Sequence, residues 1–193
     1  MKKLFALMLA LVLCLSCASA LAADKVGVSM PTQDLQRWVQ DGENMQKELE
    51  ANGYEVMLTY SANNVATQVA DLENMITNGC KVLVVASIDG GALGDVLAKA
   101  KDAGIMVIAY DRLLMGTEAV DYYATFDNYK VGTIQADFII KTLDLENTDK
   151  TFRMEVFAGS PDDNNALFFY NGAMDALKPY IDAGKLVVPT GET

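Results

Sequence analysis

Residues 73–90, ENMITNGCKVLVVASIDG, decide the fold class of this chain. A helical pattern ends here at Asn78-Gly79, where the glycine can take the left-handed conformation that caps a helix. The continuous apolar run Val82–Val85 follows, and such a run is typical of a strand that is covered on both faces. A helix followed by a strand of this kind predicts an α/β protein with a parallel sheet.

The same strand-and-helix unit recurs on both sides of this stretch. Strand patterns are predicted at 25–30, 55–60, 82–87, 105–110, 121–126, 153–158 and 185–188. Helical patterns are predicted at 34–51, 65–78, 91–103, 129–143 and 164–178. Alternation of this kind implies doubly wound parallel sheets with right-handed crossovers.

The connection between the strands at 105–110 and 121–126 interrupts the alternation. It has ten residues and no room for a helix, and the rhythm restarts after Thr125-Phe126-Asp127-Asn128. We therefore expect an N-terminal α/β lobe at 23–126 and a C-terminal α/β lobe at 127–193. The second lobe holds too few elements to bury a doubly wound core, and the sequence stops directly after a strand. We expect this lobe to be incomplete and the sequence to be a fragment of a longer protein.

The first 22 residues have the pattern of a secretory signal peptide. Two lysines precede an apolar stretch at 4–17, and Ala20-Leu21-Ala22 fits the cleavage rule for small residues. We expect this segment, residues 1–22, to be removed on export. The alternative is a lipoprotein site at 15–17, with Cys17 as the lipidated residue.

Composition excludes several classes of function. The first 22 residues hold two lysines and no acid, so the remainder has 13 basic and 26 acidic side chains and a net charge of −13. That charge argues against nucleic acid and anionic membranes as partners. The chain has no histidine, which excludes a Ser-His-Asp triad and a histidine-ligated zinc. It also has no G-x-G-x-x-G motif and no Walker lysine, so we expect no nucleotide cofactor.

Polar side chains follow four of the predicted strands at their carboxyl ends, where open parallel sheets bind ligands. Arg37-Trp38 follow the first strand, Asp89-Gly90-Gly91 the third and Asp111-Arg112 the fourth. The residues after the strand at 153–158 include Asp162, Asp163, Asn164 and Asn165. Sugar hydroxyls both donate and accept hydrogen bonds, which suits carboxylates beside guanidinium and amide groups. An aromatic ring suits the apolar face of a pyranose, so the sequence predicts a sugar site.

Each of these residues also has a purely structural interpretation. Asp111 and Arg112 can form a surface ion pair, and a lone tryptophan such as Trp38 often belongs to a core. Asp89 can lie near a helix cap.

The acidic loop has the same two interpretations. Asp163 or Asn164 can cap the helix at 164–178. We assign Asp162 and Asn164 to the turn and the helix start, and Asp163 and Asn165 to the sugar. The loop lacks the spacing, the glycine and the glutamate of an EF-hand, so we expect no metal site.

Six stretches of the chain match a known family. They are Gln36-Arg37-Trp38, the stretch at 73–90, VIAYDRL at 107–113, YYATFDNYKVG at 122–132, SPDDNNA at 160–166 and LKPYIDAGKLVV at 177–188. On these, the chain resembles the sugar-binding proteins of ABC transporters, in the ribose, galactose and xylose group of type I periplasmic binding proteins. The resemblance implies two α/β lobes around a hinged cleft that closes on the sugar. It also implies that a longer chain completes the second lobe.

The resemblance further implies roles for particular residues. The residues implied to bind the sugar are Arg37, Trp38, Asp111 and Arg112 from the first lobe and Asp163 and Asn165 from the second. Trp38 would stack on the sugar ring, and the polar side chains would bond its hydroxyls. The residues implied to form one hinge crossing are Thr125, Phe126, Asp127 and Asn128.

The function implied is that of a binding protein rather than an enzyme. It would hold a monosaccharide of the xylose, glucose, galactose or arabinose class in the periplasm and deliver it to the membrane subunits of an ABC permease, without a cofactor. The alternative is a sensory receptor that presents the sugar to a membrane kinase or chemoreceptor. An exported sugar-active enzyme would need a carboxylate pair such as Asp111 and Asp163. An arginine neighbour favours the charged form of an aspartate, which makes it a poor proton donor.

Overall fold

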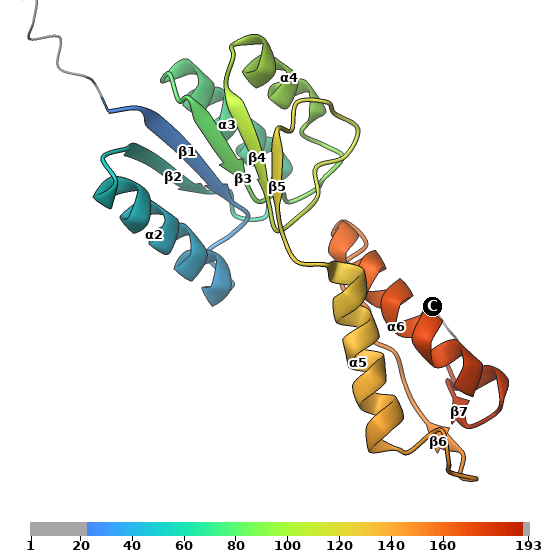
Figure 1. Cartoon of the computed structure of the whole chain (residues 1–193). Helices are drawn as coiled ribbons and strands as arrows, with labels where there is room; N and C mark the ends of the chain where they lie inside the picture. Colours follow the sequence, from blue (N-terminus) through green and yellow to red (C-terminus); the bar gives the residue numbers. More distant parts are fainter. Residues whose placement is uncertain (1–22, 191–193) are drawn as a thin grey trace, which may run out of the picture.

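The structure, a computed structural model, describes residues 23–190 and shows two α/β lobes joined near residues 125–128 (Figure 1). We call residues 23–126 the first lobe and residues 127–190 the second lobe. The predicted secretory signal, with Cys17, lies outside the described residues. None of the helices within residues 23–190 is long and apolar enough to cross a membrane.

The first lobe is built on a five-stranded parallel sheet with the strand order β2-β1-β3-β4-β5. The strands are β1 (Lys25–Met30), β2 (Glu55–Tyr60), β3 (Val82–Val85), β4 (Met106–Tyr110) and β5 (Tyr122–Ala124). The register places Val26 of β1 between Val56 of β2 and Val82 of β3. The predicted α/β fold with a parallel sheet is confirmed.

Helices cover both faces of this sheet (Figure 1). They are α2 (Gln36–Ala51) on one face and α3 (Val65–Thr77) and α4 (Gly94–Asp102) on the other. Neighbouring residues of β3 serve the two faces, because Leu83 belongs to the core with α3 and α4 and Val84 belongs to the core with α2. This alternation is the two-residue period of a strand. The apolar run that predicted a strand covered on both faces is therefore confirmed.

Local hydrogen bonds fix where the helices begin and end. The Asn64 side chain accepts from the backbone N of Thr67 at 3.0 Å and caps α3, which stops just before Gly79 with a φ of 78°. That left-handed glycine is the predicted stop. Helix α4 begins at Gly94 rather than at 91, because the Asp89 side chain accepts from the Gly91 N at 2.8 Å and holds a turn there.

The second lobe consists of two long helices and two short strands. They are α5 (Asn128–Thr142), β6 (Phe152–Arg153), α6 (Asn164–Asp182) and β7 (Leu186–Val187), and β6 pairs parallel with β7. Helices α5 and α6 lie side by side because Gly132 and Gly172 let the two backbones approach closely. A Cβ atom on Gly132 would collide with the carbonyl oxygen of Phe169, and one on Gly172 would collide with that of Tyr129.

The predicted strand at 153–158 is wrong in its extent. Strand β6 keeps only Arg153 from it. The Met154 backbone N still donates to the Val187 carbonyl oxygen of β7 at 2.9 Å, and residues 155–158 belong to no strand in the part of the chain that the structure describes. A strand needs a hydrogen-bonded neighbour along its length, and β7 is only two residues long. Phe157 is consequently 94% exposed. The second lobe as described has one small core, formed by residues of α5, α6 and the short strands.

Candidate functional site

The carboxyl ends of β1 and β4 bring the first predicted site residues together. Arg37, at the start of α2, donates from Nη2 to Asp111 Oδ1 at 2.9 Å and from Nε to Asp41 Oδ2 at 3.3 Å. Asp111 directly follows β4 and is 7% exposed. Burial alone would lower the pKa of the Arg37 guanidinium, but the hydrogen bond and the charge of Asp111, with the charge of Asp41, raise it. Arg37 and Asp111 therefore form a charged, hydrogen-bonded pair.

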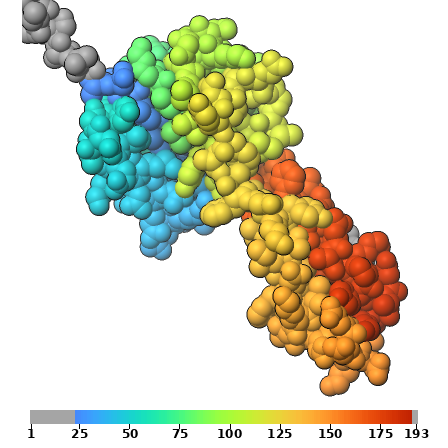
Figure 2. Space-filling model, viewed as in Figure 1, coloured from blue at the N-terminus to red at the C-terminus, as the bar shows by residue number. Residues whose placement is uncertain are grey.

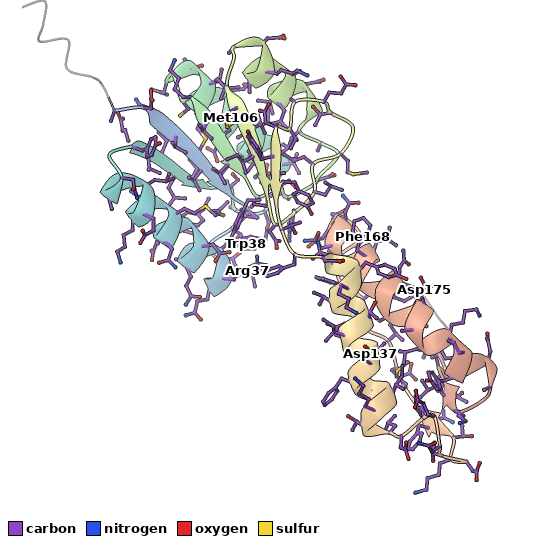
Figure 3. The ribbon with its side chains drawn as sticks, viewed as in Figure 1. Arg37, Trp38, Met106, Asp137, Phe168 and Asp175 are labelled. Carbon is purple, nitrogen blue, oxygen red and sulfur yellow. The ribbon has the colours of Figure 1, made fainter. Side chains whose placement is uncertain are left out.

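Trp38 lies in the core of the first lobe, and two guanidinium groups lie over its ring. Its side chain is 3% exposed and belongs to the core cluster with Val28 and Met30. The Cζ atoms of Arg37 and Arg112 lie 4.6 and 5.4 Å from the ring centroid, which is cation–π range. Figure 3 shows Arg37 and Trp38 at the end of the first lobe that faces the second lobe. The structure thus makes Trp38 a core residue that also borders the lobe contact.

Arg112 connects the first lobe with the second. Its Nη1 atom donates to the carbonyl oxygens of Ser87 at 3.0 Å and Ile88 at 3.3 Å, just beyond β3. Its Nε atom lies 3.3 Å from Asp163 Oδ2 of the second lobe, and the two side chains are 19% and 22% exposed. Asp111 and Arg112 are therefore not a surface ion pair with each other, because each is paired with a residue distant in sequence.

The acidic loop before α6 divides its side chains between the helix start and the lobe contact. Asp163 is the N-cap of α6, since its Oδ1 accepts from the Asn165 backbone N at 2.9 Å while its Oδ2 faces Arg112. Helix α6 begins at Asn164, as predicted, while the side chain that caps it is that of Asp163. Asn165 is 4% exposed and lies in the contact between the lobes rather than on a cavity wall.

A cavity of about 240 Å³ lies between the first lobe and this loop. The residues that line it are Leu35, Trp38, Asn63, Ile88, Arg112, Ser160, Asp162 and Asp163. Drug-sized ligands occupy about 300–1,000 Å³, so this cavity suits a smaller ligand. A larger cavity of about 360 Å³ within the second lobe is lined mainly by apolar side chains against residues 154–159 and has no arginine. The cavity between the lobes is therefore the candidate site.

Buried polar atoms without a partner gather at this cavity. Across residues 23–190, the buried side-chain atoms that lack a hydrogen-bond partner are Trp38 Nε1, Thr59 Oγ1, Ser87 Oγ and Arg112 Nε. Trp38 and Arg112 line the cavity, and Arg112 binds the backbone of Ser87. An unsatisfied buried polar group costs about 1–3 kcal/mol. Two of the four atoms, Trp38 Nε1 and Arg112 Nε, thus belong to residues that line the cavity, whereas Ser87 does not line it. Arg112 Nε lies within ion-pair distance of Asp163 Oδ2 but makes no hydrogen bond, so a hydroxyl oxygen in the cavity can accept from both atoms.

Sequence reasoning missed three residues at this site. Asn63, in the loop after β2, lines the cavity with a φ of 52°, and the rule of strand carboxyl ends could have found it. Ser87 follows β3 directly but belongs to no motif. Tyr110 ends β4 and donates from its hydroxyl to Asp41 Oδ2 at 3.1 Å. Burial first, and this hydrogen bond second, raise the pKa of Tyr110.

The four predicted hinge residues form the connection between the lobes. Thr125 donates from Oγ1 to the Asp111 carbonyl oxygen at 3.0 Å, and Asn128 Nδ2 donates to Thr125 Oγ1 at 3.3 Å. The Asp127 side chain accepts from the Lys130 backbone N at 2.9 Å and caps α5. The Phe126 side chain is 71% exposed.

Metal chemistry has no support at this site. The described residues contain no group of three cysteine or acidic side chains that could hold a metal ion. Of the two carboxylates that line the cavity, Asp163 is paired with Arg112, and Asp162 accepts from Ser160 Oγ at 3.5 Å. The arrangement offers hydrogen-bonding side chains around a cavity, which are the features of a binding site.

Comparison with known proteins gives one consistent result. Residues 26–192 match the family described as periplasmic binding protein domain. The chain is 56% identical to the multiple sugar-binding periplasmic receptor ChvE of Rhizobium radiobacter over 91% of this chain and 50% of that protein. It is 39% identical to the D-xylose-binding periplasmic protein of Escherichia coli K12 over 85% of this chain and 48% of that protein.

A solved structure agrees with these relatives. An ABC transporter solute-binding protein from Clostridium phytofermentans with bound β-D-glucose superposes with a TM-score of 0.85 and 62% sequence identity, over 87% of this chain and 52% of that one. The chain spans about half the length of the curated relatives it matches.

Proposed function

Because this chain belongs to the periplasmic binding protein domain family, we propose that it binds a monosaccharide in the cavity between its lobes and serves an ABC sugar importer. Membership of the family confirms the predicted periplasmic binding protein, which is a binding protein and not an enzyme. The sugar and its delivery to a permease are our proposal for the whole protein.

The observation that carries this proposal is the cluster of unsatisfied polar atoms at the cavity. Trp38 Nε1 and Arg112 Nε can donate to a hydroxyl oxygen. A sugar hydroxyl supplies that acceptor, whereas a purely apolar ligand would leave both atoms without a hydrogen bond. The volume of about 240 Å³ suits a single sugar ring better than an oligosaccharide.

The paired charges around the cavity support the same ligand. The Arg37–Asp111 and Arg112–Asp163 pairs each hold a donor and an acceptor within 3.3 Å. A sugar that enters exchanges part of these contacts for hydrogen bonds to its hydroxyls, without a change in net charge. The Trp38 ring lies under two guanidinium groups, so we propose that it positions them and presents its Nε1 edge.

Calorimetry tests this proposal directly. The chain of 193 residues is titrated with D-glucose, D-xylose, D-galactose and L-arabinose, with the Rhizobium radiobacter receptor as a positive control. We expect heat of binding with at least one sugar, and weaker binding than by the longer receptor because the second lobe is incomplete. No heat with any of the four sugars would reject the proposal.

A substitution at Trp38 separates its edge from its ring. Trp38→Phe keeps an aromatic face for Arg37 and Arg112 but removes Nε1, the atom without a partner. Affinity should fall about 5- to 10-fold, the value of one hydrogen bond of about 1 kcal/mol. Leu167→Phe, at a 57% exposed position on α6, serves as the control. Unchanged affinity of the Trp38→Phe variant would show that Trp38 contributes only to the core of the first lobe and not to sugar binding.

Delivery to a permease is the second part of the proposal. The glucose-bound protein from Clostridium phytofermentans supports it, because that protein is an ABC transporter solute-binding protein. The test is the ATPase rate of the cognate permease in proteoliposomes, with and without this protein and its sugar. Stimulation that depends on the sugar is expected, and equal rates in all arms would limit the function to sugar binding.

A further inference from the structure

Gln68 of α3 is a buried amide that joins this helix to two strands of the first lobe. Its side chain is 0% exposed. Its Nε2 atom donates to Ser29 Oγ of β1 at 3.1 Å and to the carbonyl oxygen of Ala86, directly after β3, at 3.0 Å. Its Oε1 atom accepts from the Ile88 backbone N at 2.9 Å. Both donor protons of the Gln68 amide and its acceptor oxygen are therefore in use.

These contacts fix the segment that follows β3. The Ala86 carbonyl group can only accept and the Ile88 N–H group can only donate, so the Gln68 amide has one orientation that satisfies both. The two backbone groups lie on either side of Ser87. Gln68 therefore holds both ends of the short segment at residues 86–88, which we call the β3 loop.

The β3 loop in turn holds Arg112. The Arg112 Nη1 atom donates to the Ser87 carbonyl oxygen at 3.0 Å and to the Ile88 carbonyl oxygen at 3.3 Å. Both carbonyl groups belong to the segment that Gln68 fixes, and Ile88 and Arg112 both line the cavity. Two successive layers of hydrogen bonds therefore lead from Gln68 to the cavity.

All of these residues belong to the first lobe. Figure 2 shows this lobe as a body that a narrow neck joins to the second lobe. The hydrogen bonds of Gln68 and of Arg112 Nη1 lie within that body, on α3, β1 and the β3 loop. The position of the Arg112 guanidinium group is therefore restrained within the first lobe itself, whatever the angle between the lobes.

We propose that Gln68 is a positioning residue for the sugar site: it fixes the Ser87 and Ile88 carbonyl groups, and these hold Arg112 in place beside the cavity. The positioning of Arg112 stands on this geometry alone, whereas its effect on affinity rests on the proposed sugar site. Gln68 is not one of the described residues that line the cavity, so it acts through Arg112 rather than by touching the ligand.

The benefit to binding comes from the freedom that Arg112 loses before the sugar arrives. A long guanidinium side chain has many rotamers, and a ligand that orders it must offset that entropy. Two hydrogen bonds to fixed carbonyl groups remove much of this freedom in the empty site. If the β3 loop becomes mobile, the acceptors of Nη1 move with it, and the sugar then has to order Arg112 on binding.

Nuclear magnetic resonance of the guanidinium group measures the positioning of Arg112 without any sugar. The Cζ–Nη1 bond cannot rotate unless both hydrogen bonds to the β3 loop break, so the parent chain should give separate signals for the two Nη1 protons. Arg112→Lys assigns these signals by their loss. Gln68→Met fills the same space without an amide, so we expect faster rotation and merged signals in this variant of the full chain.

A second variant and a matched control keep the result decisive. Gln68→Asn keeps the amide on a shorter side chain that cannot reach Ser29, Ala86 and Ile88 together, so it should merge the signals even if Gln68→Met fails to fold. Leu72→Ala, one turn further along α3 and also 0% exposed, destabilises the same buried face and should leave two signals. Separate signals in a folded Gln68 variant would overturn the proposal.

Calorimetry of the same samples separates this proposal from the proposed function. Gln68→Met should lower sugar affinity about 5- to 10-fold, the value of roughly one hydrogen bond, while Leu72→Ala should leave it unchanged. Lost affinity with separate Arg112 signals would show that Gln68 acts by another route and overturn its role. Merged signals with unchanged affinity would overturn the link to the sugar.

Failure of the sugar site gives a different result. If the parent chain binds none of the four sugars, the proposed function fails, while the Nη1 signals of the Gln68 variants still decide whether Gln68 positions Arg112.

Discussion

The two lobes share the same alternation of strand and helix patterns in sequence, but they differ in how many of the predicted strands form. In the first lobe, five strands pair side by side, and helices cover both faces over two separate cores. In the second lobe, two helices pack on each other over one small core, and β6 and β7 have two residues each. Strand patterns become strands only where a neighbouring strand offers hydrogen bonds along their length.

The surfaces of the lobes show the same difference. The second lobe exposes large apolar side chains on α5, α6 and the segment after β6, and the most exposed are Phe157 at 94%, Phe138 at 70%, Leu167 at 57% and Ile134 at 56%. The predictions below test this difference in order of expected effect.

The largest effect is expected from a cavity in the core of the first lobe. Leu83→Ala removes a fully buried side chain from the middle of β3 and should lower the free energy of unfolding by about 2–5 kcal/mol. Leu177→Ala in the core of the second lobe should lie at the lower end of that range, because its less constrained surroundings can collapse into the space. Urea unfolding followed by Trp38 fluorescence and by far-ultraviolet circular dichroism measures both variants.

These two probes separate the lobes, because the one tryptophan of the chain belongs to the first lobe. Leu83→Ala should shift the transition seen by fluorescence, and Leu177→Ala should shift mainly the one seen by circular dichroism. Leu167→Ala, at an exposed site, is the control and should stay within about 0.5 kcal/mol. Equal shifts of both signals in both variants would show that the lobes unfold as one unit.

The next effect concerns the close contact of α5 with α6. Gly172→Val places a branched side chain against the carbonyl group of Tyr129 and should destabilise the second lobe by about 1–3 kcal/mol. Hydrogen exchange should rise in α5 and α6 and stay low in the sheet of the first lobe. Gly94→Ala, where an added Cβ meets only ordinary contact, is the control. Unaltered hydrogen exchange in α5 and α6 would mean that the two helices can move apart without loss of stability.

Removal of an N-cap side chain from one helix in each lobe compares the lobes with the same kind of substitution. Asn64→Ala removes the cap of α3 in the first lobe and should cost about 1 kcal/mol of stability. Asp163→Ala removes the cap of α6 and also the partner of Arg112, so it should cost at least as much and weaken sugar binding. Thermal unfolding and calorimetry measure the two effects. Sugar affinity that falls equally in both variants would show that the effect comes from general loss of stability.

The smallest effect concerns the titration of Tyr110. Its pKa in the folded chain is raised, so its contribution to stability is complete below the unfolded value of about 10 and is lost as pH rises through the folded pKa. Tyr110→Phe removes both this titration and the hydrogen bond to Asp41, so stability at neutral pH should fall by about 1 kcal/mol or less. The loss of stability as pH rises above about 10 should then be less steep than in the parent chain. Alkaline unfolding curves and phenolate absorbance measure the change, and identical alkaline slopes would contradict the shift.

The candidate site was predictable from the sequence where a residue's place depends on its own strand. Arg37 and Asp111 follow strands of the sheet in the first lobe, and the carboxyl ends of its parallel strands meet at one edge. The pairing of Arg112 with Asp163 was not predictable, because it joins the first lobe to the loop before α6 and depends on how the two lobes meet. The sugar-binding roles of all six predicted residues stay predictions.

The sequence alone determined the parallel sheet of the first lobe, since the run at Val82–Val85 and the stop at Gly79 depend on local pattern and on the conformational freedom of glycine. It also determined the family, through stretches that span both lobes. Only the tertiary structure decided that Trp38 lies under two arginines, that Arg112 meets Asp163, and that Asn165 holds the Asp111 carbonyl group. The physical reason is the separation along the chain over which each kind of interaction acts. Periodicity and capping act within a few residues, whereas the partner of a buried polar group is whatever the packing of distant segments brings within about 3 Å of it.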